Sequence, residues 1–109
     1  MNLKGKFIEE VLKIKESHFF RTSEDNLVGF WFKGIEGEAL HLILKDSEIE
    51  STTESPCLKE YKEGKELTHE QAHGSLVIIW KGFDEKEVEY IVEEIKNGVK
   101  KLREISGWK

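Results

Sequence analysis

The segment 69–73 reads HEQAH and has the most recognisable chemical spacing in the chain, because it matches the zinc-hydrolase pattern HExxH. In that pattern two histidines one helical turn apart bind zinc, and the glutamate activates a metal-bound water. The residues involved are His69, Glu70 and His73. Here Thr68 can cap a short helix, Gly74 can end it, and a β-branched run follows directly. A zincin helix must continue beyond the motif, so we expect no metal site and keep a small zinc hydrolase only as an alternative.

Cys57 is the only cysteine, which excludes an internal disulfide and a multi-cysteine zinc site. It lies in a polar, loop-like stretch where a thiol is accessible, and accessibility is a requirement for thiolate chemistry. Lys59 and Lys62 favour the thiolate, whereas Glu54 and Glu60 oppose it. The residues alone therefore leave two alternatives, a reactive thiol and an incidental surface cysteine.

The composition fits one domain, 1–109, with a modest hydrophobic core. The net charge is −5, from 17 basic and 22 acidic side chains. This sign disfavours a nucleic-acid partner, since phosphate backbones attract basic surfaces. No apolar run approaches the roughly 20 residues of a membrane-spanning helix, and the first residues lack the apolar core of a signal peptide. We therefore expect no membrane insertion and a cytoplasmic location.

The hydrophobic pattern predicts most of the elements that must position these side chains. Apolar residues at helical spacing predict a first helix over 3–16, and residues 18–22 are a short extended candidate. The runs 27–33 (LVGFWFK) and 75–81 (SLVIIWK) are apolar on both faces, which is typical of buried strands. Residues 47–53 are also expected to be extended.

Residues 38–45 (EALHLILK) are ambiguous by periodicity alone. Leu40, Leu42 and Leu44 alternate as in a strand, whereas Leu40, Ile43 and Leu44 form a helical stripe. The pattern does not decide between the two.

The last element has the clearest signals and is predicted as a helix over 84–103. Asp84 can cap it, and Glu87 three residues later completes an Asp/Glu variant of the capping box. Acidic residues crowd its start and basic residues its end, as the helix dipole favours. Its apolar stripe, in which Ile95 is central, should pack across a sheet; the stripe comprises Val88, Ile91, Val92, Ile95, Val99 and Leu102.

Several segments, in a fixed order, resemble one known family. They are FIEEVLKI (7–14), NLVGFWFKG (26–34), GIEGEALHLILKD (34–46), LTHEQAHGSL (67–76), DEKEVEYIVEEI (84–95) and VKKLREISGW (99–108). Together they resemble the small C-terminal domain of NifS/IscS-type cysteine desulfurases, which have the class V aminotransferase fold. The resemblance makes the ambiguous segment 38–45 helical. It also makes the HExxH match a by-product of a short helix that precedes a strand.

The fold class that follows is α+β. We expect a two-layer small domain in the order helix–strand–strand–helix–strand–short helix–strand–helix, with the helices packed on a mainly antiparallel sheet.

The resemblance also assigns roles. The segment TTESPC (52–57) lies where the family has its nucleophile loop, so Cys57 falls on the cysteine that takes sulfur from the substrate bound to pyridoxal phosphate (PLP) and holds it as a persulfide. Val77 falls on the arginine that binds the substrate carboxylate, which a valine cannot do. The large domain with the PLP lysine is not among the matching segments. We therefore expect no cofactor on this chain and no desulfurase activity from it alone.

Two main hypotheses follow for the function. The first is a partner-binding or sulfur-relay module, and the second is a subunit of a split PLP-dependent class V enzyme. Both imply a homo-oligomer or a protein partner, either a large-domain chain or a sulfur acceptor, because a free copy of the domain would expose an apolar face. Trp31, Phe32 and Trp80 are the candidates for that face, unless helices of the domain cover both sides of the sheet.

Overall fold

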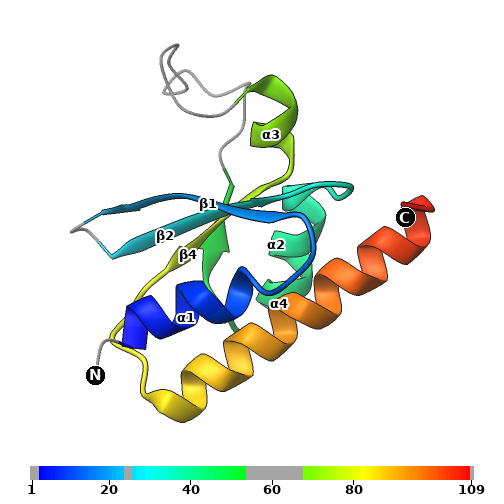
Figure 1. Cartoon of the computed structure of the whole chain (residues 1–109). Coiled ribbons are helices and arrows are strands. Elements are labelled where there is room, and N and C mark those ends of the chain that lie inside the picture. Colours follow the sequence, from blue (N-terminus) through cyan, green and yellow to red (C-terminus); the bar gives the residue numbers. More distant parts are fainter. Residues whose placement is uncertain (1–2, 24–25, 54–67, 109) are drawn as a thin grey trace.

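The structure, a computed structural model, describes residues 3–23, 26–53 and 68–108 (Figure 1). It is an α+β domain in the predicted element order. The elements are α1 (Leu3–Val11), β1 (Ser17–Ser23), β2 (Leu27–Phe32), α2 (Gly37–Asp46), β3 (Ser51–Thr52), α3 (His69–His73), β4 (Ser75–Ile79) and α4 (Glu85–Ser106).

The four strands form one antiparallel sheet in the order β1-β2-β4-β3. The register pairs Phe30 with Leu76 and Gly29 with Val77 on the two central strands. Since successive side chains of a strand point to opposite faces, this register gives each face its own set of residues. The predicted sheet, with β2 and β4 at its centre, is confirmed.

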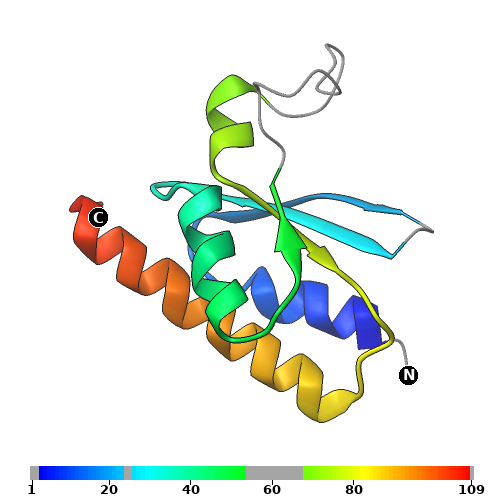
Figure 2. The same cartoon turned by 180° about the vertical axis from the view of Figure 1, so that it is seen from behind.

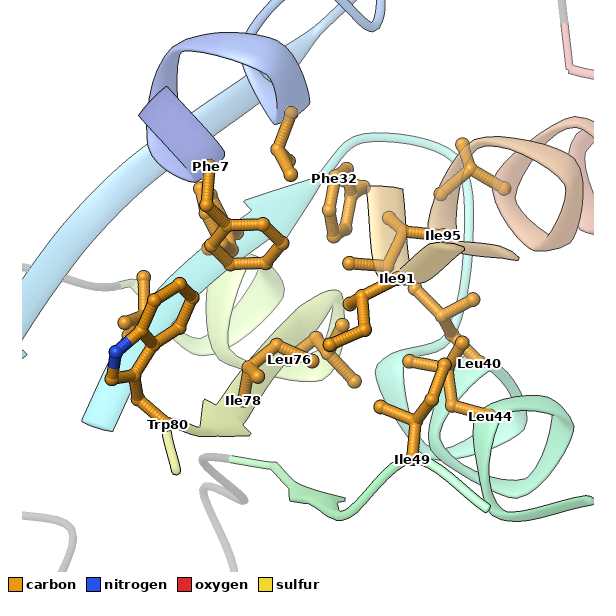
Figure 3. Close-up of a cluster of buried hydrophobic side chains, with 14 of the residues drawn as sticks. Phe7, Phe32, Leu40, Leu44, Ile49, Leu76, Ile78, Trp80, Ile91 and Ile95 are labelled. Atoms are coloured by element: carbon orange, nitrogen blue, oxygen red, sulfur yellow. The ribbon is translucent and has the colours of Figure 1, made fainter. Parts of the chain in front are cut away.

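One face of the sheet carries the hydrophobic core. Figure 1 shows α1 and α4 on one side of the sheet, and Figure 2 shows α2 on the same side. Side chains from these helices and from the central strands form one buried cluster (Figure 3). Its labelled members are Phe7, Phe32, Leu40, Leu44, Ile49, Leu76, Ile78, Trp80, Ile91 and Ile95. The three longer helices therefore cover the same face, and the possibility that helices of the domain cover both faces equally is not realised.

Two of the three residues expected on a docking face lie in this core instead. Phe32 is 1% exposed and Trp80 is 8% exposed. Phe7 explains this placement, because its ring lies against the core face, with centroids 5.3 Å from Trp80 and 5.7 Å from Phe30. Of the three, only Trp31 belongs to the other face, so the expectation for Phe32 and Trp80 was wrong.

The closing helix α4 is capped as predicted and runs longer. The Asp84 carboxylate accepts a hydrogen bond from the Glu87 amide at 2.8 Å, and the Glu87 carboxylate accepts one from the Asp84 amide at 2.9 Å. At the other end Gly107 adopts a φ of 74°, and the Trp108 amide donates to the Arg103 carbonyl at 3.0 Å. This left-handed residue ends the helix, as is common for a glycine just past a helix C-terminus. No helix in the described ranges is both long and apolar enough to cross a membrane.

Two other predicted elements, the first helix and the strand over 47–53, are shorter in the structure for local reasons. The first helix ends at Val11, before the predicted residue 16, because single turns follow it and Glu16 reverses the chain with a φ of 54°. The Ser17 hydroxyl donates to the Ile14 carbonyl at 2.6 Å and fixes that turn. The expected strand over 47–53 shrinks to β3, since the chain first turns after α2 through Glu48, whose φ is 63°.

The core position of Ile95 generates the first prediction. Its side chain is fully buried in the cluster between α4 and the sheet. Ile95→Ala should lower the free energy of unfolding by about 2–5 kcal/mol, the usual cost of truncating a packed aliphatic side chain. The control Ile105→Ala removes an isoleucine of the same helix that is 72% exposed, and it should change stability by no more than about 0.5 kcal/mol. Urea unfolding followed by circular dichroism measures both, and equal effects would contradict the assignment of the buried face.

Candidate functional site

The face of the sheet that α1, α2 and α4 leave uncovered is called here the second face. Because Val28, Phe30 and Phe32 belong to the core, their neighbours Leu27, Gly29 and Trp31 point to the second face. The same alternation places Ser75, Val77 and Ile79 of β4 beside them. Leu27, Trp31 and Ile79 are partly exposed, whereas Val77 is fully buried. The second face is thus apolar and partly accessible.

Aromatic rings extend the second face onto the edge strand β1. The His18 ring stacks on the Trp31 indole, with centroids 4.1 Å apart and planes 18° from parallel. An irregularity in the register between Phe19 and Arg21 places the Phe20 ring directly over Gly29, where a Cβ atom would lie only 2.7 Å from it. A larger residue at position 29 would therefore displace the Phe20 ring.

A hollow of about 800 Å³ begins at Trp31 and lies between β2, α3 and the end of α4. Its size falls in the range of ordinary ligand sites. Apolar and polar side chains both line it. They include Trp31, Ile35, Ala39, Leu102 and Ile105 on the apolar side and Glu16, Lys33, Glu36, Gln71 and His73 on the polar side. Ile105 is 72% exposed, so a large apolar side chain stands open at the rim.

Arg103 holds one wall of the hollow in place. Its Nε donates to the Lys33 carbonyl at 3.0 Å, and its Nη2 donates to the Glu16 carbonyl at 3.2 Å. Both accepting residues line the hollow, and Glu16 also accepts a backbone hydrogen bond from Lys33 at 3.1 Å. Burial lowers the pKa of the Arg103 guanidinium, and the Glu16 carboxylate partly offsets this effect. An arginine nevertheless keeps its charge at neutral pH.

Cys57 lies outside the described residues, but both ends of its segment are described. On one side Thr52 of β3 pairs with Val77 of β4. On the other side Thr68 caps α3, which leads through Gly74 into the start of β4. The described residues on both sides of the Cys57 segment therefore lie next to β4: Thr52 pairs with its middle residue, and α3 leads into its first residue. Thr68 also lines the hollow, so the hollow adjoins one of these attachment points.

The HExxH segment forms the short helix that was predicted. The Thr68 hydroxyl accepts from the Gln71 amide at 3.1 Å, the Gln71 side chain accepts from the Thr68 amide at 2.9 Å, and Gly74 is the C-cap. The helix α3 has five residues and β4 begins at Ser75, so it does not continue as a zincin helix does. His73 is exposed and faces the hollow. The side chains of His69 and Glu70 are outside the described part, and within that part no three potential metal ligands come together.

Val77 occupies the place at which the resemblance implies a substrate-binding arginine. Its side chain is fully buried, opposite Gly29 and Thr52 in the sheet register. An aliphatic side chain cannot form the bidentate salt bridge that an arginine makes with a carboxylate. The described residues thus do not fit a site for an amino-acid substrate at this position.

Two functional candidates escaped the sequence patterns. Arg103 looked like an ordinary basic residue at a helix end, yet it follows Ile95 and Val99 on the buried stripe at intervals of four, and that spacing signals its burial. The stacking of His18 on Trp31 depends on strand register, which no local pattern specifies. His41 lies on α2, and its Nδ1 is 2.9 Å from the Ser51 hydroxyl oxygen.

In sequence the chain is similar to part of a cysteine desulfurase, and in fold it is similar to part of a NifS-like protein and of a putative sugar aminotransferase. The curated protein "Cysteine desulfurase IscS 1" of Archaeoglobus fulgidus is 30% identical over 114 residues, which cover 95% of this chain and 30% of that protein. No family model matches the chain. The resemblance found in the sequence motifs is therefore confirmed at the level of a partial match.

Solved structures show the same fold at lower identity. A NifS-like protein superposes with a TM-score of 0.72 at 21% identity, over 92% of this chain and 27% of the other. A putative sugar aminotransferase of Streptococcus pneumoniae gives TM-scores of 0.60 in its PLP form and 0.65 in its PMP form, at 19% and 17% identity. This chain covers 31% and 32% of those two chains, so it spans about a third of the proteins it matches.

Removing the Arg103 guanidinium tests its role in the hollow's wall. Arg103→Met should lower the free energy of unfolding by about 3–6 kcal/mol, because two hydrogen bonds from a charged group are lost and each contributes roughly 1.5–3 kcal/mol. Lys101→Met is the matched control, since Lys101 is exposed on the same helix, and it should change stability by less than about 0.5 kcal/mol. Chemical denaturation measures both variants. Equal stabilities of the two variants would show that the Arg103 contacts do not hold this wall.

Proposed function

We propose that this chain is a partner-binding module that relays sulfur, with Cys57 as the persulfide carrier, and that it does not desulfurate cysteine by itself. One observation carries the proposal. An apolar second face, which the three longer helices leave uncovered, adjoins the strands to which the Cys57 segment is attached. The similarity to part of a cysteine desulfurase, over 95% of this chain, supports sulfur as the group that is transferred.

The second face has the composition of a docking surface. Trp31 and Phe20 are partly exposed aromatic residues, and Leu27 and Ile79 add partly exposed aliphatic area. Aromatic residues are enriched at protein interfaces, and a large contiguous exposed apolar patch marks an interaction site. The partner is a protein that donates or accepts sulfur, and it would cover this face while its reactive group meets Cys57.

The transfer step needs neither a metal nor an external oxidant. The Cys57 thiolate attacks the outer sulfur of a donor persulfide, the donor's sulfur–sulfur bond breaks, and the donor leaves as a thiolate. The transferred sulfur keeps its proton, and Cys57 becomes the persulfide. In a second step of the same kind, the thiolate of a sulfur acceptor would attack the outer sulfur of the Cys57 persulfide, and Cys57 would leave as the thiolate. The buried Val77 in place of a carboxylate-binding arginine supports a relay that never binds free cysteine.

A second candidate function is a subunit of a split PLP-dependent class V enzyme. The observation that favours it is coverage, since the chain spans only 30% of the cysteine desulfurase that it matches. In this case the second face would pack on a separate chain that carries the PLP lysine. Sulfide release from free cysteine that requires both chains separates this function from the relay, which needs no PLP chain of its own.

The carrier role predicts a reactive Cys57. In native protein its alkylation should titrate below the model thiol value of about 8.5, and a small-molecule persulfide such as glutathione persulfide should add one sulfur atom to it. Alkylation between pH 6 and 9 and intact-mass spectrometry measure the two effects, with unfolded protein as the reference and Cys57→Ser as the control. A Cys57 that reacts no faster in native than in unfolded protein would contradict the carrier role and leave only partner binding.

The docking role predicts that replacing Trp31 slows sulfur transfer from protein donors and not from small-molecule donors. Trp31→Ser should slow sulfur transfer from a persulfide-loaded cysteine desulfurase by about tenfold, since a buried tryptophan at an interface is commonly worth 1–2 kcal/mol or more, and about 1.4 kcal/mol is a factor of ten. Transfer from glutathione persulfide should be unchanged. Leu42→Ser is the matched control, because Leu42 is 54% exposed on α2 in the helical layer, and it should leave both rates unchanged. Equal slowing by the two variants would contradict docking through the second face.

A further inference from the structure

A second concave surface lies on the helical layer, away from the second face. It is a groove of about 540 Å³ between the end of α1 and the last turns of α4, and it is called here the α1–α4 groove. Ile14, Val92, Val99 and Trp108 supply its apolar side chains. We propose that the α1–α4 groove binds an acidic, amphipathic segment of a partner protein.

The charge around the groove is opposite to that of the whole chain. Five basic side chains line it, namely Lys13, Lys15, Lys96, Lys100 and Arg103, against three acidic ones, Glu10, Glu93 and Glu104. The chain as a whole carries a net charge of −5. Clustered charge of one sign attracts and orients a partner of the other sign. The groove therefore favours an acidic partner. The rest of the surface is net negative and repels such a partner.

Several of these cations are free to bind. Among the residues that the structure describes, Lys96 and Lys100 form no ion pair. Of the glutamates in the groove, Glu10 forms an ion pair with Lys13 at 3.0 Å. Lys96 and Lys100 are four residues apart on α4, so they lie about one helical turn, or roughly 6 Å, from each other along one wall. Two carboxylates at the same spacing on a partner helix would each lie opposite one of these two lysines.

The floor of the groove combines a buried cation with an aromatic ring. Arg103 is 8% exposed, and its hydrogen bonds to described residues go to two backbone carbonyls rather than to a carboxylate. Its guanidinium carbon lies 4.1 Å from the centroid of the Trp108 ring, and the Lys15 ammonium lies 5.9 Å from the same ring. A partner carboxylate at this point would meet positive charge from both walls, while an apolar side chain beside it would contact Trp108 and Val92.

An acidic peptide fits this groove better than a nucleic acid does. Glu93 and Glu104, which also line the groove, would repel a continuous phosphate backbone, which carries a charge at every nucleotide. A peptide can place carboxylates only where the lysines are and apolar side chains between them. The groove and the second face lie on different layers, so this proposal stands independently of the sulfur relay.

The test uses three end-blocked, fluorescein-labelled amphipathic peptides, each about four helical turns long. All three share the same leucine positions, and their polar face is Glu, Gln or Lys. The Glu peptide should bind the full chain at least about tenfold more tightly than the Gln peptide in fluorescence anisotropy, and binding should weaken as salt is raised. The Lys peptide should not bind. Equal binding of the Glu and Gln peptides, or no binding of the Glu peptide, would overturn the proposal without any mutation.

Paired variants locate the site. Lys96→Glu with Lys100→Glu should weaken binding of the Glu peptide by at least about tenfold. Lys86→Glu with Lys101→Glu makes the same charge change on exposed positions of the same helix outside the groove, and it should weaken binding by less than about threefold. Equal loss in both pairs would overturn the proposal, because it would show attraction to net charge rather than to the groove. Displacement of the peptide by a single-stranded oligonucleotide at equal concentration would overturn it in favour of a general polyanion site.

Discussion

The guanidinium of Arg103 is the interaction on which the described surfaces depend. The Arg103 side chain is 8% exposed, and its hydrogen bonds join the last turns of α4 to the ends of the β1–β2 hairpin. Arg103 binds the carbonyls of Glu16 and Lys33, which line the hollow. Arg103 itself also lines the α1–α4 groove, together with Trp108. Both concave surfaces therefore share one buried cation.

The second constraint is that the three longer helices all pack on one face of the sheet. The central strands are apolar on both faces, but α1, α2 and α4 all pack on one of them. Burial of Phe30, Leu76 and Ile78 against these helices stabilises the fold, while Trp31, Leu27 and Ile79 stay partly exposed on the other face. An apolar strand pattern that exceeds the needs of a two-layer domain is what a docking face requires. The proposed function rests on these apolar side chains of the second face, which the three longer helices do not cover.

The sequence predicted those parts of the fold that local interactions determine. The capping boxes at Asp84 and Thr68 and the apolar stripe of α4 depend on residues close in sequence, and each was confirmed. The side of the sheet that Phe32 and Trp80 face was not predictable in this way. Both strands are apolar throughout, so the alternation that normally separates buried from exposed positions is missing.

The candidate site was predictable in part. The short helix α3 followed from its capping residues, and the resemblance placed Val77 on a strand, where it is fully buried. The segment 38–45 needed the resemblance to be identified as helical, because its leucines fit both periods. The burial of Arg103 and the stacking of His18 on Trp31 arise from contacts between elements far apart in sequence. Cys57 lies outside the described residues, so its role stays a prediction.

The central claim is that a sulfur-transfer partner binds the second face of the sheet. The most direct measurement is a titration of isotope-labelled chain with a persulfide-loaded cysteine desulfurase, followed by amide chemical shifts in solution NMR. We expect the largest shifts on β2 and β4 around Leu27, Trp31 and Ile79, together with Cys57, while the exposed side of α2 around Leu42 stays unchanged. Shifts confined to the helical layer, with the amides of β2 and β4 unmoved, would contradict it.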